Sequence, residues 1–242
     1  MTRHVMLNNV AHKDLRVITR RAAEFGDDVP SVMTFPTEFG DVQREYPIFF
    51  RQDAATGDYV CVALLGFEKN ENLFLDEAGW HASYLPGVIV RGPFLIGFQN
   101  QEPVIHVDLD DPRISHTEGE AVFLPQGGNS RYLDHVATVL KGIHAGLAVS
   151  KAMFAAFTAL NLIEPVKVEI KFNPEEQYDL LGLHTVSEEK LAALDGESLA
   201  SLNRAGFLQG AFLQLASLNN VKKLIDMKHR KRRRQADDGI LK

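Results

Sequence analysis

The segment 103–110, PVIHVDLD, contains residues whose types and spacing could support metal chemistry. In a strand, successive side chains point to opposite faces, so His106 and Asp108 would share one face and the apolar residues between them the other. A histidine and a carboxylate at this spacing are two of the three ligands of a non-haem iron facial triad. The pattern therefore predicts, as one alternative, an Fe(II)-dependent oxygenase that binds an oxo-acid and dioxygen.

Such a site needs a third ligand, which would be another histidine. His135, His144 and His184 follow later in the chain, and their spacing does not indicate which of them would approach His106. A half-buried strand also presents a polar face to solvent without binding anything. We favour this structural interpretation and predict no cofactor, with Fe(II) as the alternative.

Aromatic and cationic side chains in the segment 79–94 could contact a ligand or a partner. Trp80 and Tyr84 could form a platform that stacks on a sugar, an indole or a partner side chain, although such rings more often complete a core. Arg91 could bind a carboxylate or a phosphate, or it could end a strand in solvent. Core packing and the strand end are the favoured interpretations, and the three residues stay candidates for ligand or partner contact.

The run KHRKRRR at 228–234 is the sharpest charge feature. It contains six Lys or Arg residues, and removing them would change the formal net charge from −6 to −12. A tail of this kind could bind phosphates or an acidic membrane, but it contains no aromatic residue that could stack on bases. We expect a disordered tail at 228–242, attracted at most to acidic groups, and expect its deletion to leave folding intact. The candidate anion-binding residues are Lys228, Arg230, Lys231, Arg232, Arg233 and Arg234.

The sequence contains no recognisable catalytic signature. Cys61 is the only cysteine and lies in an apolar run, which excludes an intramolecular disulfide and predicts a buried, inert thiol. Phosphate-binding glycine loops and a decodable Ser-His-Asp order are missing. A binding or accessory role is therefore favoured over an enzyme.

The elements that would position these residues differ between the two halves of the chain. Up to about residue 125, short apolar runs alternate with Gly, Pro, Asn and Asp, which predicts strands at YPIFF, YVCVALLGF, NLFL, GVIV and PVIHVDL. Gly57 would supply the positive φ of a hairpin between the first two.

In the second half the apolar spacing becomes helical. It predicts a long helix or a broken helix pair from Ser130 to about Pro165. Gly142, Gly146 and Ser150 form a small-residue stripe that could permit close packing, which we favour, or mark a kink. Two strands at 166–172 and 179–186 and shorter helices from Ser187 to about residue 225 follow. The fold class is α+β, with a β-rich, largely antiparallel N-terminal half packed against C-terminal helices.

Length and composition indicate one globular domain over 1–227. Of the 242 residues, 45% are hydrophobic and 24% charged, as in ordinary globular proteins. No linker separates the halves. The N-terminus lacks the apolar stretch of a secretory signal and no run approaches the ~20 apolar residues of a membrane span, so the cytoplasm is the expected location.

The ordered segments HKDLRV, PTEFGDVQREYPIFF, YLPGVIVRGPF and LNRAGFLQGAFLQLASLNNVKKL resemble the bacterial SapC family over nearly the whole chain up to about residue 225. Gly87 and Gly92 are small departures from the family pattern. The family is named for a surface-layer association, and members also occur beside genes for tryptophan halogenases. The resemblance implies no defined reaction.

We therefore expect a SapC-like accessory or interaction protein that works with a glycan or small-molecule uptake or modification system, with another protein as its partner. The iron-dependent oxygenase is one alternative. Nucleic-acid binding through the basic tail is the other and is the less favoured of the two.

Overall fold

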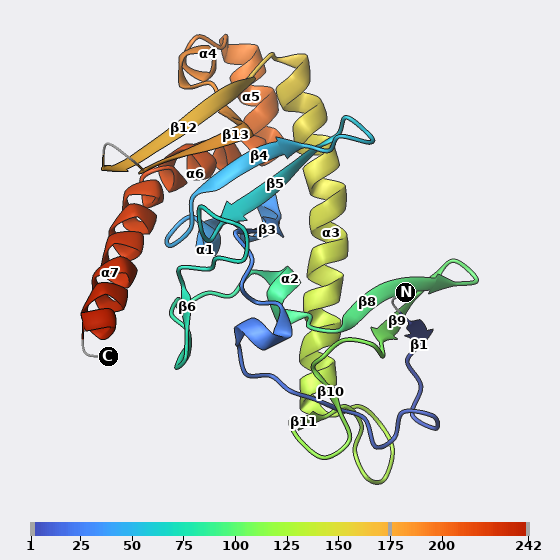
Figure 1. The fold of residues 1–242 in the computed structure, drawn as a ribbon. Helices are drawn as coiled ribbons and strands as arrows, with labels where there is room; N and C mark the ends of the chain where they lie inside the picture. Colours follow the sequence, from blue (N-terminus) through green and yellow to red (C-terminus); the bar gives the residue numbers. More distant parts are fainter. Residues whose placement is uncertain (1–2, 174–175, 241–242) are drawn as a thin grey trace. The chain divides into compact units, whose positions relative to one another are not determined.

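The computed structural model describes residues 3–173 and 176–240 and has the expected α+β architecture (Figure 1). The chain forms two compact units that interleave along the sequence. The first comprises Met1–Asp28, Leu75–His81 and Leu85–Ala145, and the second Val29–Phe74, Ala82–Tyr84 and Gly146–Lys242. The single domain expected over 1–227 stays a prediction, since two compact units can still unfold as one cooperative domain. The sequence carries no linker because one long helix runs through both units.

The first unit is built from short antiparallel strands. One sheet has the order β1-β9-β8, a second has the order β10-β2-β11, and β6 and β7 form a small hairpin. The bounds are β1 His4–Met6, β2 Arg16–Val17, η1 Ala23–Phe25, β6 Leu75–Asp76, β7 Gly79–Trp80, α2 Gly87–Val90, β8 Phe94–Gln99, β9 Glu102–Asp108, β10 Ile114–Ser115 and β11 Glu120–Ala121.

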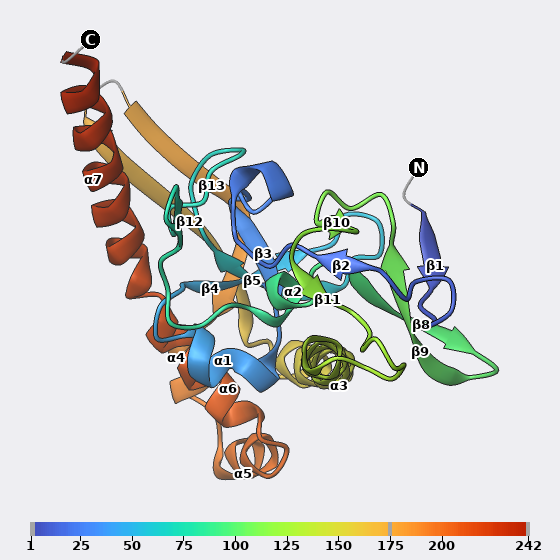
Figure 2. The same cartoon turned by 90° about the horizontal axis from the view of Figure 1, so that it is seen from below.

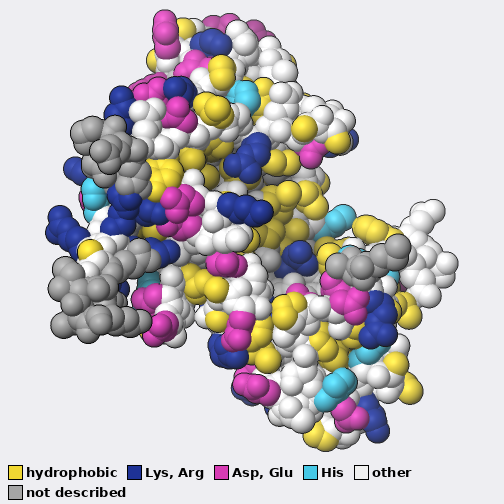
Figure 3. All heavy atoms as spheres, viewed as in Figure 1, with side chains coloured by type: hydrophobic (Ala, Val, Ile, Leu, Met, Phe, Trp, Pro, Cys, Tyr) yellow, Lys and Arg dark blue, Asp and Glu magenta, His cyan; other side chains and the backbone are white. Residues whose placement is uncertain are grey.

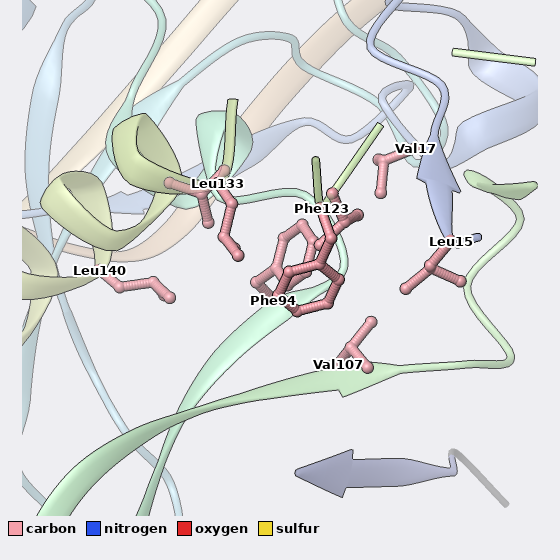
Figure 4. Packing of buried hydrophobic residues seen from close by; sticks show 9 residues of the cluster. Leu15, Val17, Phe94, Val107, Phe123, Leu133 and Leu140 are labelled. Carbon is pink, nitrogen blue, oxygen red and sulfur yellow. The ribbon is translucent and has the colours of Figure 1, made fainter. Parts of the chain in front are cut away.

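The core of the first unit gathers apolar side chains from these strands and from helix α3 (Arg131–Ala159). Phe94 and Val107 are fully buried, and Leu133 and Leu140 of α3 reach the same cluster (Figure 4). Val107 points into this core, so the alternation predicted for β9 is confirmed, and the neighbouring polar side chains lie on the other face.

The second unit contains a five-stranded antiparallel sheet with the order β12-β13-β4-β5-β3. The two strands expected after the long helix therefore join the strands of the N-terminal half, through the pair β13–β4. The bounds are β3 Ser31–Thr34, η2 Pro36–Glu38, α1 Phe39–Val42, β4 Ile48–Gln52, β5 Tyr59–Leu64, β12 Ile163–Asn173, β13 Glu176–Val186, α4 Glu188–Ala192, α5 Gly196–Arg204, α6 Phe207–Ser217 and α7 Asn220–Ile240.

One local prediction about this sheet is confirmed. The β4–β5 hairpin turns at Gly57, which has a φ of 75°. Asp195 caps α5 by accepting a hydrogen bond of 2.7 Å from the Ser198 N–H.

Helix α3 begins after Ser130, whose hydroxyl accepts a hydrogen bond from the Leu133 N–H at 3.2 Å, as an N-cap does. It runs unbroken to Ala159, so the small-residue stripe does not mark a break. Among the described residues, α3 is the one helix whose length and composition would allow it to cross a membrane. A single helix of this kind is weak evidence for a membrane span. Core helices of globular proteins have the same property, and α3 contributes Leu133, Met153 and Phe157 to buried clusters.

Three sequence-based predictions about elements are wrong. GVIV forms the short helix α2 rather than a strand, because Pro86 starts the turn and the Arg91 N–H closes it on the Gly87 carbonyl. NLFL contributes only its last residue, Leu75, to a strand, and Phe74 is fully buried in the loop before it. The segment 228–240, expected to be disordered, continues helix α7 (Figures 1 and 2), and its first residue, Lys228, lies 5.3 Å from the ring centroid of Tyr178 in β13.

Candidate functional site

The second unit contains an open groove of about 910 Å³ between helix α3 and the sheet. In Figure 3, hydrophobic side chains gather over α3 beside β4 and β5. We call this hollow the α3–sheet groove. Its walls are residues 147, 150, 151, 154, 155, 158 and 159 of α3 and residues 33–35, 52 and 57–61 of the sheet side.

The order of large and small residues along α3 explains the groove. Phe154 and Phe157 hold the helix on the sheet, with ring centroids 5.0 and 6.3 Å from that of Phe50. On the adjoining face, Ala155 and Ala159 are too small to fill the space above β5. A stripe that repeats every three or four residues over 147–159 gives the groove a length of roughly 18 Å.

Gly146 sets the approach of the helix at one end of the groove. A Cβ atom at this position would lie 2.7 Å from Cβ and Cγ of Phe35, so only glycine permits the observed separation. Gly142, by contrast, faces open space. The close packing predicted for the small-residue stripe is therefore confirmed at Gly146 and not at Gly142.

Polar side chains share this lining with the apolar ones, and they are Thr34, Gln52, Asp58, Tyr59, Ser150, Lys151 and Thr158. The Ser150 hydroxyl is fully buried and has no hydrogen-bond partner within the described chain. Lys151, one residue further, is exposed, and within the described ranges its ammonium has no ion pair. Buried polar atoms usually have partners, so Ser150 and Lys151 together mark a place that could accept a polar or anionic group.

The sheet side of the groove has few reactive side chains. Asp58 lies on the β4–β5 turn, next to Tyr59, whose ring centroid is 5.7 Å from that of Phe154. Burial raises the pKa of the Cys61 thiol well above its ordinary value, with a further contribution from the negative charge of Glu38. The expected inert thiol is thus supported, because a protonated buried thiol is a poor nucleophile.

The iron-site residues lie in the first unit. His4 Nε2 is 3.4 Å from Asp108 Oδ2 across the β1–β9 pair, and the His106 ring lies close over Gly97 of β8. No three His, Cys, Asp or Glu side chains come together in a metal-binding arrangement among the described residues. The facial triad thus lacks a third ligand in that part of the chain.

The three histidines considered as third ligands have other neighbours. The His144 ring packs 5.8 Å from Phe98, and His135 is exposed on α3. His184 belongs to the second unit, where its ring lies 5.1 Å from Tyr59. Its Nδ1 is buried and has no hydrogen-bond partner in the described residues.

Trp80 and Tyr84 are partly buried and belong to different units. Trp80 pairs with Leu75 in the β6–β7 hairpin. The Tyr84 hydroxyl donates a hydrogen bond of 2.6 Å to Glu38, and burial together with this carboxylate raises the pKa of Tyr84. The Tyr46 hydroxyl donates to the Tyr84 carbonyl at 2.6 Å, so Tyr84 secures the loop to the second unit.

Arg91 is partly buried in the first unit, at the end of α2, rather than at a solvated strand end. Its guanidinium donates a hydrogen bond of 2.7 Å to the Phe94 carbonyl. Burial lowers the pKa of Arg91. The Arg91 side chain thus stabilises the backbone at the start of β8.

The basic run divides between two faces of α7. Lys228 is buried, and its ammonium lies 2.6 Å from Glu71 and 3.0 Å from Glu68. Lys231 approaches Glu71 at 3.8 Å. Burial by itself would lower the pKa of Lys228, but the hydrogen bonds to Glu71 and Glu68 outweigh it and raise the pKa. Arg230, Arg233 and Arg234 are exposed.

The chain belongs to the SapC family, whose model matches residues 7–224. The resemblance inferred from the ordered segments is confirmed. No curated protein and no solved structure matches the chain.

The α3–sheet groove was not among the sequence-based candidates. Its signal in the sequence is the helical spacing of the small residues Ser150, Ala155 and Ala159. Of these, the predicted packing stripe included only Ser150. A stripe of small residues indicates either close packing or a hollow, and the sheet opposite it decides between the two.

Proposed function

We propose that this SapC family protein is a binding protein rather than an enzyme, and that the α3–sheet groove holds a small apolar molecule with an anionic group. The observation that carries the proposal is the groove itself, which combines an apolar lining with the unpartnered Ser150 hydroxyl and the unpaired Lys151 ammonium. Its volume lies in the range of small-molecule sites, roughly 300–1,000 Å³.

The lining supports binding better than catalysis. No histidine lines the groove, Asp58 is its one carboxylate, and the Cys61 thiol is held protonated by burial. General acid–base or nucleophilic chemistry needs a second titratable group within hydrogen-bond reach. A protein that carries or presents an apolar acid fits the accessory role expected for a small-molecule uptake or modification system.

The ligand class follows from the polar groups. An apolar chain or ring would cover Phe154, Tyr59 and the small residues of α3, which removes apolar surface from water. A carboxylate near Lys151 would form a charge-assisted hydrogen bond and could supply an acceptor for Ser150. Asp58 would repel an anion at the turn, which favours one orientation.

The test is calorimetric titration of the protein with octanoate and with 1-octanol, its neutral counterpart. We expect octanoate to bind more tightly, and Lys151→Met to weaken octanoate by roughly tenfold while leaving octanol unchanged. Lys141→Met, an exposed lysine of α3 outside the groove, is the matched control.

A second pair of variants tests the location. Ala155→Trp should block both ligands because Ala155 lines the groove, whereas Ala152→Trp, exposed on α3 outside it, should not. Binding of neither ligand to the wild-type protein, or binding that survives Ala155→Trp, would contradict the proposal.

A further inference from the structure

Helix α7 has a second charged surface that the groove does not involve. Along 222–234 some of its basic residues contact glutamates of the second unit, which we call the inward set, and others are exposed, which we call the outward set. We name the exposed residues Lys222, Arg230, Arg233 and Arg234 the outward basic face. Lys222 and Arg233, eleven residues apart, lie at nearly the same angle around the helix, while Arg230 lies about 80° and Arg234 about 120° from Lys222.

The inward set contains Lys223, Lys228, Lys231 and Arg232, of which the last three line a small hollow with Glu68 and Glu71. Lys223 approaches Glu45 at 3.4 Å, and Lys228 and Lys231 approach Glu71. These contacts hold α7 against the second unit, where Leu224 is fully buried. Glu45 and Glu71 are paired with these lysines, so their carboxylates do not offset the outward basic face.

The outward basic face carries nearly uncompensated positive charge. Lys222, Arg230 and Arg233 line a shallow hollow of about 510 Å³ along α7 and have no ion pair within the described residues. Lys223, which is paired with Glu45, and His229 line the same hollow. Asp226 is the one acidic residue of that hollow. Arginine binds phosphate through two parallel N–H groups, which makes such a face suited to a row of phosphates.

We propose that the outward basic face binds the phosphate backbone of duplex nucleic acid without sequence preference. The helix is fixed at its inward side, so its cations form a stable row over 222–234, about 18 Å long. Backbone contacts of this kind need no aromatic side chain, because they neutralise phosphates instead of stacking on bases. The lack of aromatic residues therefore excludes base stacking and leaves backbone binding.

An anionic membrane is the weaker partner for the same charges. Helices that lie in a membrane surface bury an apolar face in the lipid. The apolar residues of α7, such as Leu224, face the protein, and the exposed positions from 222 to 234 carry polar or charged side chains. The helix thus offers a lipid surface charge but nothing to insert.

The experiment measures fluorescence anisotropy of a labelled DNA duplex titrated with the full chain at roughly 50 and 200 mM salt. If the face neutralises three or four phosphates, this increase in salt should weaken binding roughly 40- to 150-fold. Lys222→Gln/Arg230→Gln/Arg233→Gln should lose at least tenfold in affinity at the lower salt and become less sensitive to salt. All three side chains are exposed, and circular dichroism checks that the variant is folded.

The matched control is Lys13→Gln/Arg44→Gln/Lys141→Gln, which removes the same charge from exposed positions elsewhere. It should bind the duplex nearly as well as the wild type. Failure of the wild type to bind at low salt, or equal loss in both variants, would overturn the proposal. Tighter binding to phosphatidylglycerol vesicles than to the duplex would also overturn it, in favour of a membrane.

Discussion

At the scale of single residues, Lys228 illustrates how context changes the role of a charge. In the sequence it belongs to a uniform basic run. In the structure its side chain is buried, 6% exposed, and its ammonium contacts the carboxylates of Glu68 and Glu71. Glu71 itself is 4% exposed. Glu71 also accepts a hydrogen bond from the Phe67 N–H at 3.0 Å. A buried carboxylate needs these partners because burial of an unpaired charge is costly.

Lys228→Ala should lower the free energy of unfolding by about 3–5 kcal/mol, because it leaves Glu71 buried without its cation. Urea denaturation followed by circular dichroism measures the effect. Lys231→Ala is the control, since its side chain is 41% exposed and should contribute less than about 1 kcal/mol. The double variant Glu71→Gln/Lys228→Met should recover part of the loss. Equal effects of Lys228→Ala and Lys231→Ala would show that the buried pair is not important.

At the scale of elements, helix α3 links local sequence to two different packing environments. Its N-terminal turns pack in the first unit through Leu133, and its C-terminal turns pack in the second through Phe157. Between these parts, Gly146 allows the close approach to Phe35 at the end of the groove. Helix α7 likewise is held by its contacts with Glu45 and Glu71. Because Lys228 and Lys231 make the contacts with Glu71, we now expect deletion of 228–242 to lower stability.

Two glycine variants of α3 should have opposite effects on stability. Gly142→Ala faces open space and should stabilise the protein by about 0.5–1 kcal/mol, the gain of alanine over glycine in a helix. Gly146→Ala should destabilise it by about 1–3 kcal/mol, because its Cβ would overlap the Phe35 side chain. Thermal unfolding of both variants compares them directly. A stabilising Gly146→Ala would mean that the helix and Phe35 separate easily.

At the scale of the whole molecule, each unit has its own core. Leu15 is 2% exposed in the first unit and Leu183 is 1% exposed in the second. The sequence suggested a single cooperative domain because no linker is visible. No linker is visible because the chain passes between the two units several times, through loops and through the continuous helix α3.

Leu15→Ala and Leu183→Ala should each cost about 2–5 kcal/mol, the usual range for deleting a buried leucine side chain. Native-state hydrogen exchange then tests whether the units open independently. We expect Leu15→Ala to reduce protection mainly in the first unit and Leu183→Ala mainly in the second. Uniform loss of protection throughout the chain in both variants would instead support the single cooperative domain.

The sequence by itself determined the family, the fold class and the local elements with clear periodicity. The Gly57 hairpin, the Ser130 cap and the alternation in β9 could be predicted because each depends on neighbouring residues. Helix α2 was missed although Pro86, which starts its turn, is its direct neighbour, because the β-branched run GVIV has the composition of a strand. The ordered basic run could not be predicted, because it depends on glutamates some 160 positions away in the chain.

Tertiary structure decided the candidate sites. Whether Ala155 and Ala159 face a hollow or a neighbour depends on the sheet opposite them, and whether a lysine is paired or free depends on acids brought close by folding. His106 and Asp108 have the spacing of metal ligands, but a third ligand can be supplied only by a distant segment. Sites of this kind form from long-range contacts, which the order of residues along the chain does not specify locally.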